Sequence, residues 1–211
     1  CGRSFAVPRG KTRWQLVLFG LVNTALHYFF FYLGVSNSPG GRASILDSLG
    51  TFLLILAAAV VFREKLTLRS IFGCLLGFSG IVLINLGSTA GQFTLSGDGM
   101  LLCSSVCAMA GGLLTRVVTR KMDPLVATGH SLALGGALLI PAGLLMGAHP
   151  VGIHLQGLLI LAALVAVSAV GFSFYNQLLR YHPVGQIAIY NAFIPVLGVV
   201  LSCLLLGEPF S

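Results

Sequence analysis

Seven long apolar stretches, nearly free of charged residues, limit what this chain can fold into more than any other feature. A helix needs roughly 20 apolar residues to cross about 30 Å of hydrocarbon, and each stretch is close to that length. Runs such as LLILAAAVVF lack the alternation over about ten residues that is typical of a transmembrane β-strand. The sequence therefore predicts an all-α, polytopic membrane bundle. The seven helices are expected at about Trp14 to Gly34, Ser44 to Phe62, Ser70 to Gly87, Met100 to Thr119, Leu125 to Gly147, Gln156 to Leu179 and Gly185 to Leu206.

Composition excludes the other broad classes of protein. Only 8% of the residues are charged and 56% are hydrophobic, whereas a water-soluble domain has about 25% charged residues. Disordered chains are poor in apolar residues and rich in charge, so disorder is excluded too. The five cysteines fall mostly inside apolar runs, where cysteine behaves as a small hydrophobic residue, and they indicate no disulfide framework.

The distribution of Lys and Arg predicts an orientation in the membrane. Counting the connections alternately places eleven of the twelve basic residues on one side and only Arg42 on the other. Basic residues accumulate in cytoplasmic loops, so we expect the N-terminus inside and the C-terminus outside, in an inner or plasma membrane. The net charge of +7 reflects this asymmetry and the contact with anionic lipid that it favours. It does not indicate a nucleic-acid partner.

The chain also matches itself when it is shifted by 144 residues. Residues 28–67 then lie on residues 172–211 without a gap, with six of forty positions identical, and the loop landmarks stay in register. The matched landmarks are Pro39 with Pro183, Gly41 with Gly185, Asp47 with Asn191 and Glu64 with Glu208.

The predicted topology places matched positions on opposite sides of the membrane, so the repeats are inverted. Inverted repeats are frequent in secondary transporters, whose substrate sites lie near the midplane between the repeats. Extending the offset gives ten helices in two sets of five. We expect that the chain holds seven of them and lacks the first two and the last.

Two segments resemble a known family. FREKLTLRSIFGCLLGFSGIVLINLG (62–87) and the run from RYHP to IPVLGVVLSCLLLGEP (180–209) are similar to the EamA family of the drug/metabolite transporter superfamily, in which a Glu follows the fourth helix of each repeat. The resemblance implies a ten-helix carrier of small metabolites or drugs, often an exporter, that works by alternating access. It also implies domains at 1–87 (the last three helices of the first repeat) and 100–211 (the first four of the second), with an external linker at 88–99. Arg63 and Thr51 depart from the family pattern.

Polar side chains inside the predicted helices are the candidate substrate-binding residues, because such groups are costly in a membrane. Each has a structural alternative, an interhelical hydrogen bond that holds the bundle together. His27 is also a candidate for proton coupling, because its charge changes near neutral pH. The candidates are Asn23, His27, Tyr28, Asp47, Tyr175, Asn176, Tyr190 and Asn191.

Asp47 has two interpretations. Ser44 and Asp47 fit a capping box at the start of a helix, where the helix dipole favours an acid. Alternatively, Asp47 is a carboxylate that lines the outer half of the transport cavity. Its repeat partner Asn191 favours the second interpretation.

Three further residues are expected to act in gating or in the structure. Pro195 removes a helical hydrogen bond and predicts a kink. Glu64 and Glu208 follow helices, where the dipole disfavours an acid. We therefore expect each to have a basic partner or backbone N–H groups from the next helix.

Other functions have weaker support in the sequence. GFSG at 77–80 has the form of an intramembrane serine protease motif, with Ser79 as nucleophile, and a channel or scaffold is a second alternative. No Cys/His spacing typical of zinc and no phosphate-binding loop is present, so no metal or cofactor is expected. Gly73-x-x-x-Gly77 and Gly143-x-x-x-Gly147 are close-packing motifs, which makes a homodimer a further candidate. The substrate is not predicted.

Overall fold

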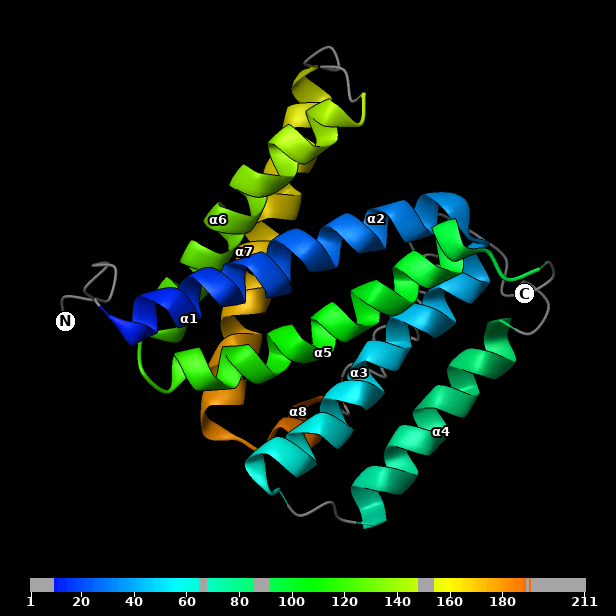
Figure 1. The fold of residues 1–211 in the computed structure, drawn as a ribbon, viewed down its shortest axis with the longest axis vertical. Helices are drawn as coiled ribbons and strands as arrows, with labels where there is room; N and C mark the ends of the chain where they lie inside the picture. Colours follow the sequence, from blue (N-terminus) through cyan, green and yellow to red (C-terminus); the bar gives the residue numbers. More distant parts are fainter. Residues whose placement is uncertain (1–9, 65–67, 86–91, 148–153, 189, 191–211) are drawn as a thin grey trace. The chain divides into compact units, whose positions relative to one another are not determined.

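The computed structural model describes residues 10–64, 68–85, 92–147, 154–188 and 190, and within these ranges it is built of helices without strands (Figure 1). Two of the helical elements, η1 and η3, are π-helical turns. The elements in chain order are α1 (Lys11–Gly20), η1 (Leu21–Leu26), α2 (His27–Asn37), α3 (Gly40–Phe62), α4 (Leu68–Asn85), η3 (Leu95–Gly99), α5 (Met100–Thr119), α6 (Pro124–Leu145), α7 (Leu155–Tyr181) and α8 (Val184–Ala188).

The all-α membrane architecture predicted from the sequence is confirmed. Within the described ranges, five helical segments are long and apolar enough to cross a bilayer, and they match five of the seven predicted spans. The predicted third span corresponds to α4. Of the predicted seventh span, the structure describes the start as α8. The five segments are Lys11–Ser36, Arg42–Phe62, Leu95–Thr119, Pro124–Leu145 and Leu155–Tyr181.

The structure differs from the predicted spans in two places, and both involve a π-helical turn. The first span is not uniformly α-helical, because its middle turn, η1, is a π-helix. The fourth span begins before Met100, because the π-helical turn η3 leads directly into α5. The predicted linker at 88–99 therefore ends in helical structure from Leu95 onward.

The chain folds as two compact units. Unit 1 comprises Cys1–Phe29 and Ala110–Tyr181, and unit 2 comprises Phe30–Met109 and His182–Ser211. Helices α2 and α5 each begin in one unit and end in the other.

Unit 1 is built around α6, which packs against α1, η1 and α7. Its hydrophobic core is formed by buried side chains of α1, α5 and α6, together with partly buried ones of α5 and of the connection between α5 and α6. These residues are Leu16, Phe19, Val118 and Ala127, with Leu114 and Met122 packed against them. Unit 2 is built around α3, which packs against α4 and α8. There, the rings of Phe52 and Phe78 meet edge to face with centroids 4.7 Å apart.

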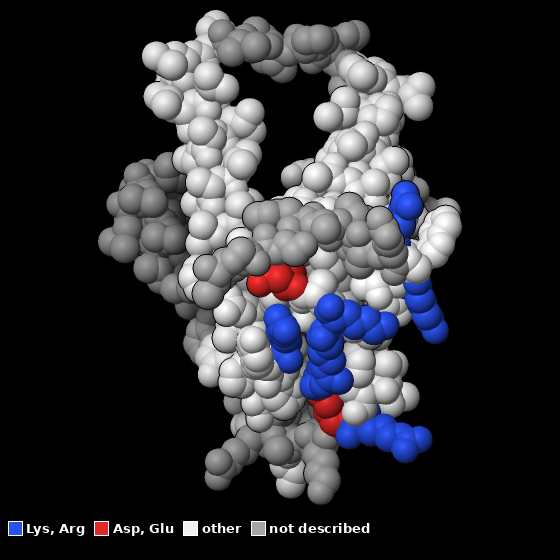
Figure 2. Space-filling view, turned by 90° about the vertical axis from the view of Figure 1, so that its left-hand side faces the viewer, with Lys and Arg blue, Asp and Glu red and all other residues white. Residues whose placement is uncertain are grey.

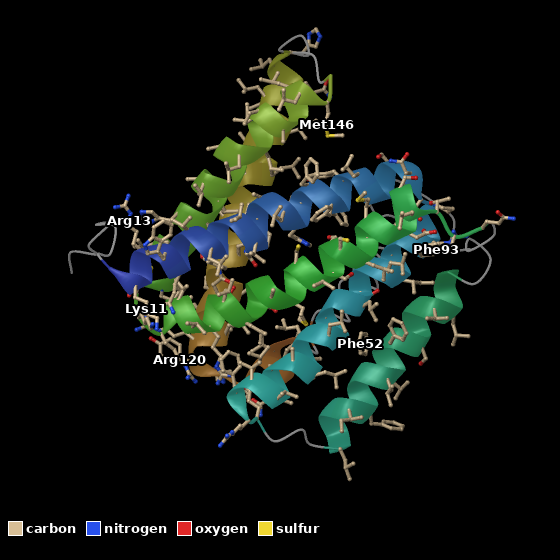
Figure 3. The ribbon with its side chains drawn as sticks, viewed as in Figure 1. Lys11, Arg13, Phe52, Phe93, Arg120 and Met146 are labelled. Carbon is tan, nitrogen blue, oxygen red and sulfur yellow. The ribbon has the colours of Figure 1, made fainter. Side chains whose placement is uncertain are left out.

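Basic side chains of unit 1 lie at one end of its helices. Lys11 and Arg13 belong to the first turn of α1, Arg120 follows the last residue of α5, and Met146 lies at the far end of α6 (Figure 3). Lys and Arg side chains are visible in blue on the face drawn in the space-filling view (Figure 2). This grouping is what the positive-inside rule leads us to expect of the cytoplasmic end.

The starts of α3 and α8 have the same register in the predicted repeat. Val184, the first residue of α8, lies 144 positions after Gly40, the first residue of α3. In both helices the carbonyl of the preceding proline accepts a hydrogen bond from a backbone N–H of the first turn. Ala43 N–H donates to Pro39 O at 2.9 Å, and Ile187 N–H donates to Pro183 O at 3.3 Å. The internal similarity of the sequence therefore has a counterpart in the backbone.

Close contact between η1 and α6 depends on a glycine. A Cβ atom built on Gly135 would overlap the Thr24 side chain and lie 3.1 Å from the backbone nitrogen of Ala25, whereas one built on Gly136 meets nothing within 4 Å. Small residues allow membrane helices to approach closely. Gly135 therefore fixes the distance between these two helices.

We expect Gly135→Ala to lower the free energy of unfolding by about 1–3 kcal/mol, because overpacking forces helices apart. The matched control is Gly136→Ala, which adds the same methyl group into open space and should raise stability by up to about 1 kcal/mol through helix propensity. Thermal unfolding of both variants in detergent makes the comparison. Equal melting temperatures for the two variants would contradict the packing of η1 on α6.

Candidate functional site

Three candidate residues lie around the π-helical turn of the first span. Asn23 belongs to η1, and His27 and Tyr28 open α2, all three half-buried. The His27 and Tyr28 rings are tilted at 54° with centroids 4.9 Å apart. A π-helical turn inside an α-helix is frequent at functional sites, and no pattern in the sequence predicted this one.

Asn23 is also the contact point between the first span and α5. A Cβ on Gly111 would lie 2.9 Å from the Asn23 Cα atom, so only glycine fits at this position. The close approach places a polar side chain against the backbone of a neighbouring membrane helix. Asn23 therefore has the surroundings of a packing residue as well as those of a candidate ligand.

Buried hydroxyl and amide groups connect α6 to its neighbours on both sides. The hydroxyls of Thr24 in η1 and Ser131 in α6 are 2.8 Å apart. The amide nitrogen of Asn176 in α7 donates to the Thr128 hydroxyl oxygen at 2.7 Å, and this hydroxyl donates to Pro124 O at 2.7 Å. These four side chains are all buried. They form a polar line through an apolar unit, which we call the α6 polar line.

The α6 polar line gives Asn176 a defined partner. Interhelical hydrogen bonds of this kind contribute about 0.6–2 kcal/mol each in membrane proteins, so the contact holds α7 to α6. Tyr175, the adjacent residue in α7, is half-buried. Of the residues in these contacts, only Asn176 was predicted from the sequence as a candidate. Thr and Ser are frequent in membrane helices without such partners, so their presence alone predicts no contact.

The capping-box interpretation of Asp47 is wrong. Helix α3 begins at Gly40, after Pro39, so Ser44 and Asp47 both lie inside the helix. The Ser44 hydroxyl donates to the carbonyl of Gly40 at 3.1 Å rather than capping a helix end. Asp47 is half-buried about two turns from the start of α3, beyond the first turn in which the dipole stabilises an acid.

Glu64 contacts the start of a helix that is distant in sequence. Helix α3 ends at Phe62, and Arg63 follows in the left-handed conformation with φ 53°. The Val184 N–H, at the first position of α8, donates to Glu64 Oε1 at 3.3 Å. A backbone N–H partner of the expected kind is therefore present, and it belongs to α8.

A buried ion pair at the other end of α3 was missed by the sequence reasoning. The Arg42 guanidinium lies 2.8 Å from the Asp98 carboxylate, which also accepts hydrogen bonds from the Ser38 hydroxyl at 2.5 Å and the Thr94 N–H at 2.9 Å. Asp98 is fully buried. A signal for the pair existed: Arg42 was the only basic residue on its predicted side, and Asp98 the only acid of the predicted linker.

The structure gives fewer contacts for the remaining candidate residues. Tyr190 is exposed, and Asn191, Pro195 and Glu208 lie outside the described residues. The Ser79 hydroxyl donates to Leu76 O at 2.9 Å within α4, an ordinary helix interaction. Over the ranges that the structure describes, no three His, Cys, Asp or Glu side chains group as metal ligands.

The profile of the EamA-like transporter family matches residues 3–86 and 95–211 of the chain. The chain belongs to this family. The unmatched segment between the two ranges ends where η3 begins, so the second match starts at a helical element. EamA-like proteins are transporters, and this chain is accordingly part of a multi-pass membrane transporter.

Known relatives agree with the family assignment. The chain is 27% identical to an uncharacterised transporter of Synechocystis, covering all of this chain and 69% of that protein. It is 25% identical to a WAT1-related chloroplastic protein of Arabidopsis thaliana, over 97% of this chain and 52% of the relative. It is also 25% identical to a probable amino-acid metabolite efflux pump of Escherichia coli, over 97% and 73%. The chain thus spans between about half and three quarters of these proteins.

A solved structure shares the fold. It superposes with a TM-score of 0.78 at 20% identity, over 94% of this chain and 70% of that one. At this level of identity the comparison concerns the arrangement of helices and not the activity.

We expect Asp98→Asn to lower the free energy of unfolding by about 3–5 kcal/mol, because removing one partner of a buried pair leaves the other charge uncompensated. Arg120→Gln, which removes an exposed charge, should change it by less than about 0.5 kcal/mol. Chemical or thermal unfolding in detergent distinguishes them. A wild-type stability for Asp98→Asn would show that the pair does not hold the start of α5 to α3.

Proposed function

We propose that this chain forms the greater part of a secondary transporter that exports small metabolites by alternating access. The observation that carries the proposal is the family match to both segments, 3–86 and 95–211. The sequence repeat relates residues 28–67 to residues 172–211, and the predicted topology gives these two stretches opposite orientations in the membrane. Inverted repeats enclose a substrate site at the midplane and rock around it.

The Glu64 contact supplies a mechanical element for this motion. A carboxylate that accepts the first N–H of α8 ties the end of α3 to the start of another helix, and N–H groups at a helix start favour a negative charge. The repeat assigns the equivalent role to Glu208, toward the start of α3. Two such ties on opposite sides of the membrane would act as hinges for the two faces of the carrier, with Pro195 as a kink in the moving helix.

The candidate ligands divide between the two units. Asn23, His27, Tyr28, Tyr175 and Asn176 belong to unit 1, and Asp47, Tyr190 and Asn191 to unit 2. We infer that some of these side chains contact substrate, because transporter sites combine an apolar lining with a few polar groups. His27 and Asp47 are the residues proposed to take up and release a proton.

The proposed substrate class and direction of transport are based on the names of two relatives. Two relatives, from Escherichia coli and Salmonella typhimurium, carry the name probable amino-acid metabolite efflux pump. We therefore propose amino-acid-like metabolites as cargo, with export across an inner or plasma membrane. The N-terminus of this chain would be cytoplasmic and its C-terminus external. Anionic lipid and a second copy of the chain are the proposed partners.

The test uses the full-length transporter in proteoliposomes with an imposed pH gradient and ³H-labelled amino acids. We expect accumulation against the solute gradient that depends on the pH gradient. Asp47→Asn should remove that dependence, because asparagine cannot take up a proton, while Ser44→Ala, one turn away on α3, should leave it unchanged.

Two results would contradict the proposal at different levels. Equilibration of the solute without accumulation would indicate a channel. Accumulation with an unchanged pH dependence in Asp47→Asn would retain the carrier and remove Asp47 from the coupling mechanism.

A further inference from the structure

A polar pocket lies inside unit 1, between the start of α6 and the end of α7. Its cavity volume is about 210 Å³, below the roughly 300–1,000 Å³ of pockets for drug-sized ligands. It is of a size for a small metabolite. The lining residues are Asp123, Pro124, Leu125, Ser173, Gln177, Arg180 and Tyr181.

One wall of the pocket is a polar stripe on an otherwise apolar helix. Ser173, Gln177 and Arg180 recur at intervals of four and three residues, so they share one face of α7. The preceding turns of α7, from Leu155 to Val170, are exposed and apolar except for Gln156 and Ser168, as expected of a surface in contact with lipid. The Ser173 hydroxyl donates to Ala169 O at 2.6 Å, so Gln177 and Arg180 are the polar groups of this face that water or a ligand would contact, because polar groups facing lipid are costly.

The lining of the pocket also includes a carboxylate, that of Asp123, which is held in a fixed position. Asp123 Oδ1 accepts hydrogen bonds from the N–H groups of Leu125 at 2.9 Å and Val126 at 3.4 Å. These bonds cap α6 and orient the side chain. Asp123 also lines the pocket, so its carboxylate supplies the negative charge of this cavity.

The positive group of the pocket has no acid bound to it. Among the residues that the structure describes, Arg180 forms no ion pair, and its guanidinium packs on the Tyr181 ring at 5.4 Å from the centroid. Arg180 and Asp123 thus line one cavity without pairing with each other. A guanidinium binds carboxylates through two parallel hydrogen bonds, and a carboxylate binds ammonium groups.

We propose that this pocket binds a small zwitterion, its anionic group on Arg180 and its ammonium group on Asp123. The site lies at the end of unit 1 that carries Arg120 and Lys121, which the charge distribution places in the cytoplasm. A free amino acid bound there would be cargo collected before it enters the central cavity, an assignment that rests on the proposed export function. Phosphatidylethanolamine carries the same pair of charges and is the second source of such a ligand.

The test measures binding separately from transport. The full-length protein is placed in nanodiscs of phosphatidylcholine alone, and L-alanine, propionate and ethylamine are titrated by calorimetry. Propionate and ethylamine each carry one half of the alanine zwitterion, so L-alanine should bind about ten-fold or more tightly than either, since each added charge contact contributes on the order of 1.4 kcal/mol or more. A second set of nanodiscs contains phosphatidylethanolamine, and the lipid retained after purification is quantified.

Three variants identify the site. Asp123→Asn keeps a good helix cap and removes the charge, and Arg180→Gln removes the guanidinium at similar size. Each should weaken L-alanine binding by about ten-fold or more. Arg120→Gln removes a charge at the same end outside the pocket and should change it less than two-fold. Melting temperatures of all variants separate loss of binding from loss of folding.

The outcomes are distinct. L-alanine binding that both pocket variants weaken supports a free amino acid, and retained phosphatidylethanolamine that both variants lose supports a lipid headgroup as the zwitterion. Equal affinity for L-alanine and propionate, or pocket variants that fold and bind as the wild type does, would overturn the proposal. The pocket variants could also fail to bind L-alanine and still export saturating amino acid at the wild-type rate. That result would leave the transport function unaffected. Absence of export by the wild-type protein would remove the transport function instead.

Discussion

The constraint on which this structure depends is that backbone polar groups in hydrocarbon must find hydrogen-bond partners within the protein. Inside a helix they do so automatically, but helix ends and irregular turns need other groups. Glu64 supplies an acceptor at the start of α8, Asp123 caps α6, and Asp98 accepts the N–H of Thr94 beside η3. Three of the five acids of the chain therefore serve helix ends or turns, which explains why so few charges are present and where they lie.

The few polar groups inside the protein also connect its helices to one another. Within unit 1 the α6 polar line joins η1, α6 and α7 through hydroxyl and amide groups, while glycine permits η1 and α6 to approach closely. Because lipid offers no hydrophobic driving force between helices, these small and polar contacts hold the bundle together. A transporter must also let helices move, and short hydrogen bonds between side chains can be exchanged at lower cost than an extensive interlocking core.

Much of the fold could be predicted from the sequence because the membrane reduces the choice to helices of known length. The spans, the repeat offset and the need of Glu64 for a backbone partner all follow from local residues. The partners themselves do not: Val184 lies 120 positions from Glu64, and Asp98 lies 56 from Arg42. The capping-box interpretation of Asp47 followed from the spacing of Ser44 and Asp47, but helix α3 already begins after Pro39. The π-helical turn η1 has no recognisable sequence pattern, and the pocket of Arg180 and Asp123 depends on the start of α6 packing beside the end of α7.

The central claim is that two related sets of helices cross the membrane in opposite directions. It is tested most directly by single-cysteine labelling of the full-length protein in intact cells, with Cys1, Cys74, Cys103, Cys107 and Cys203 replaced by serine. A membrane-impermeant maleimide applied from outside should label Glu208→Cys and leave Glu64→Cys unlabelled until the membrane is permeabilised. Labelling of both positions from the same side would contradict the inverted arrangement and the alternating-access mechanism built on it.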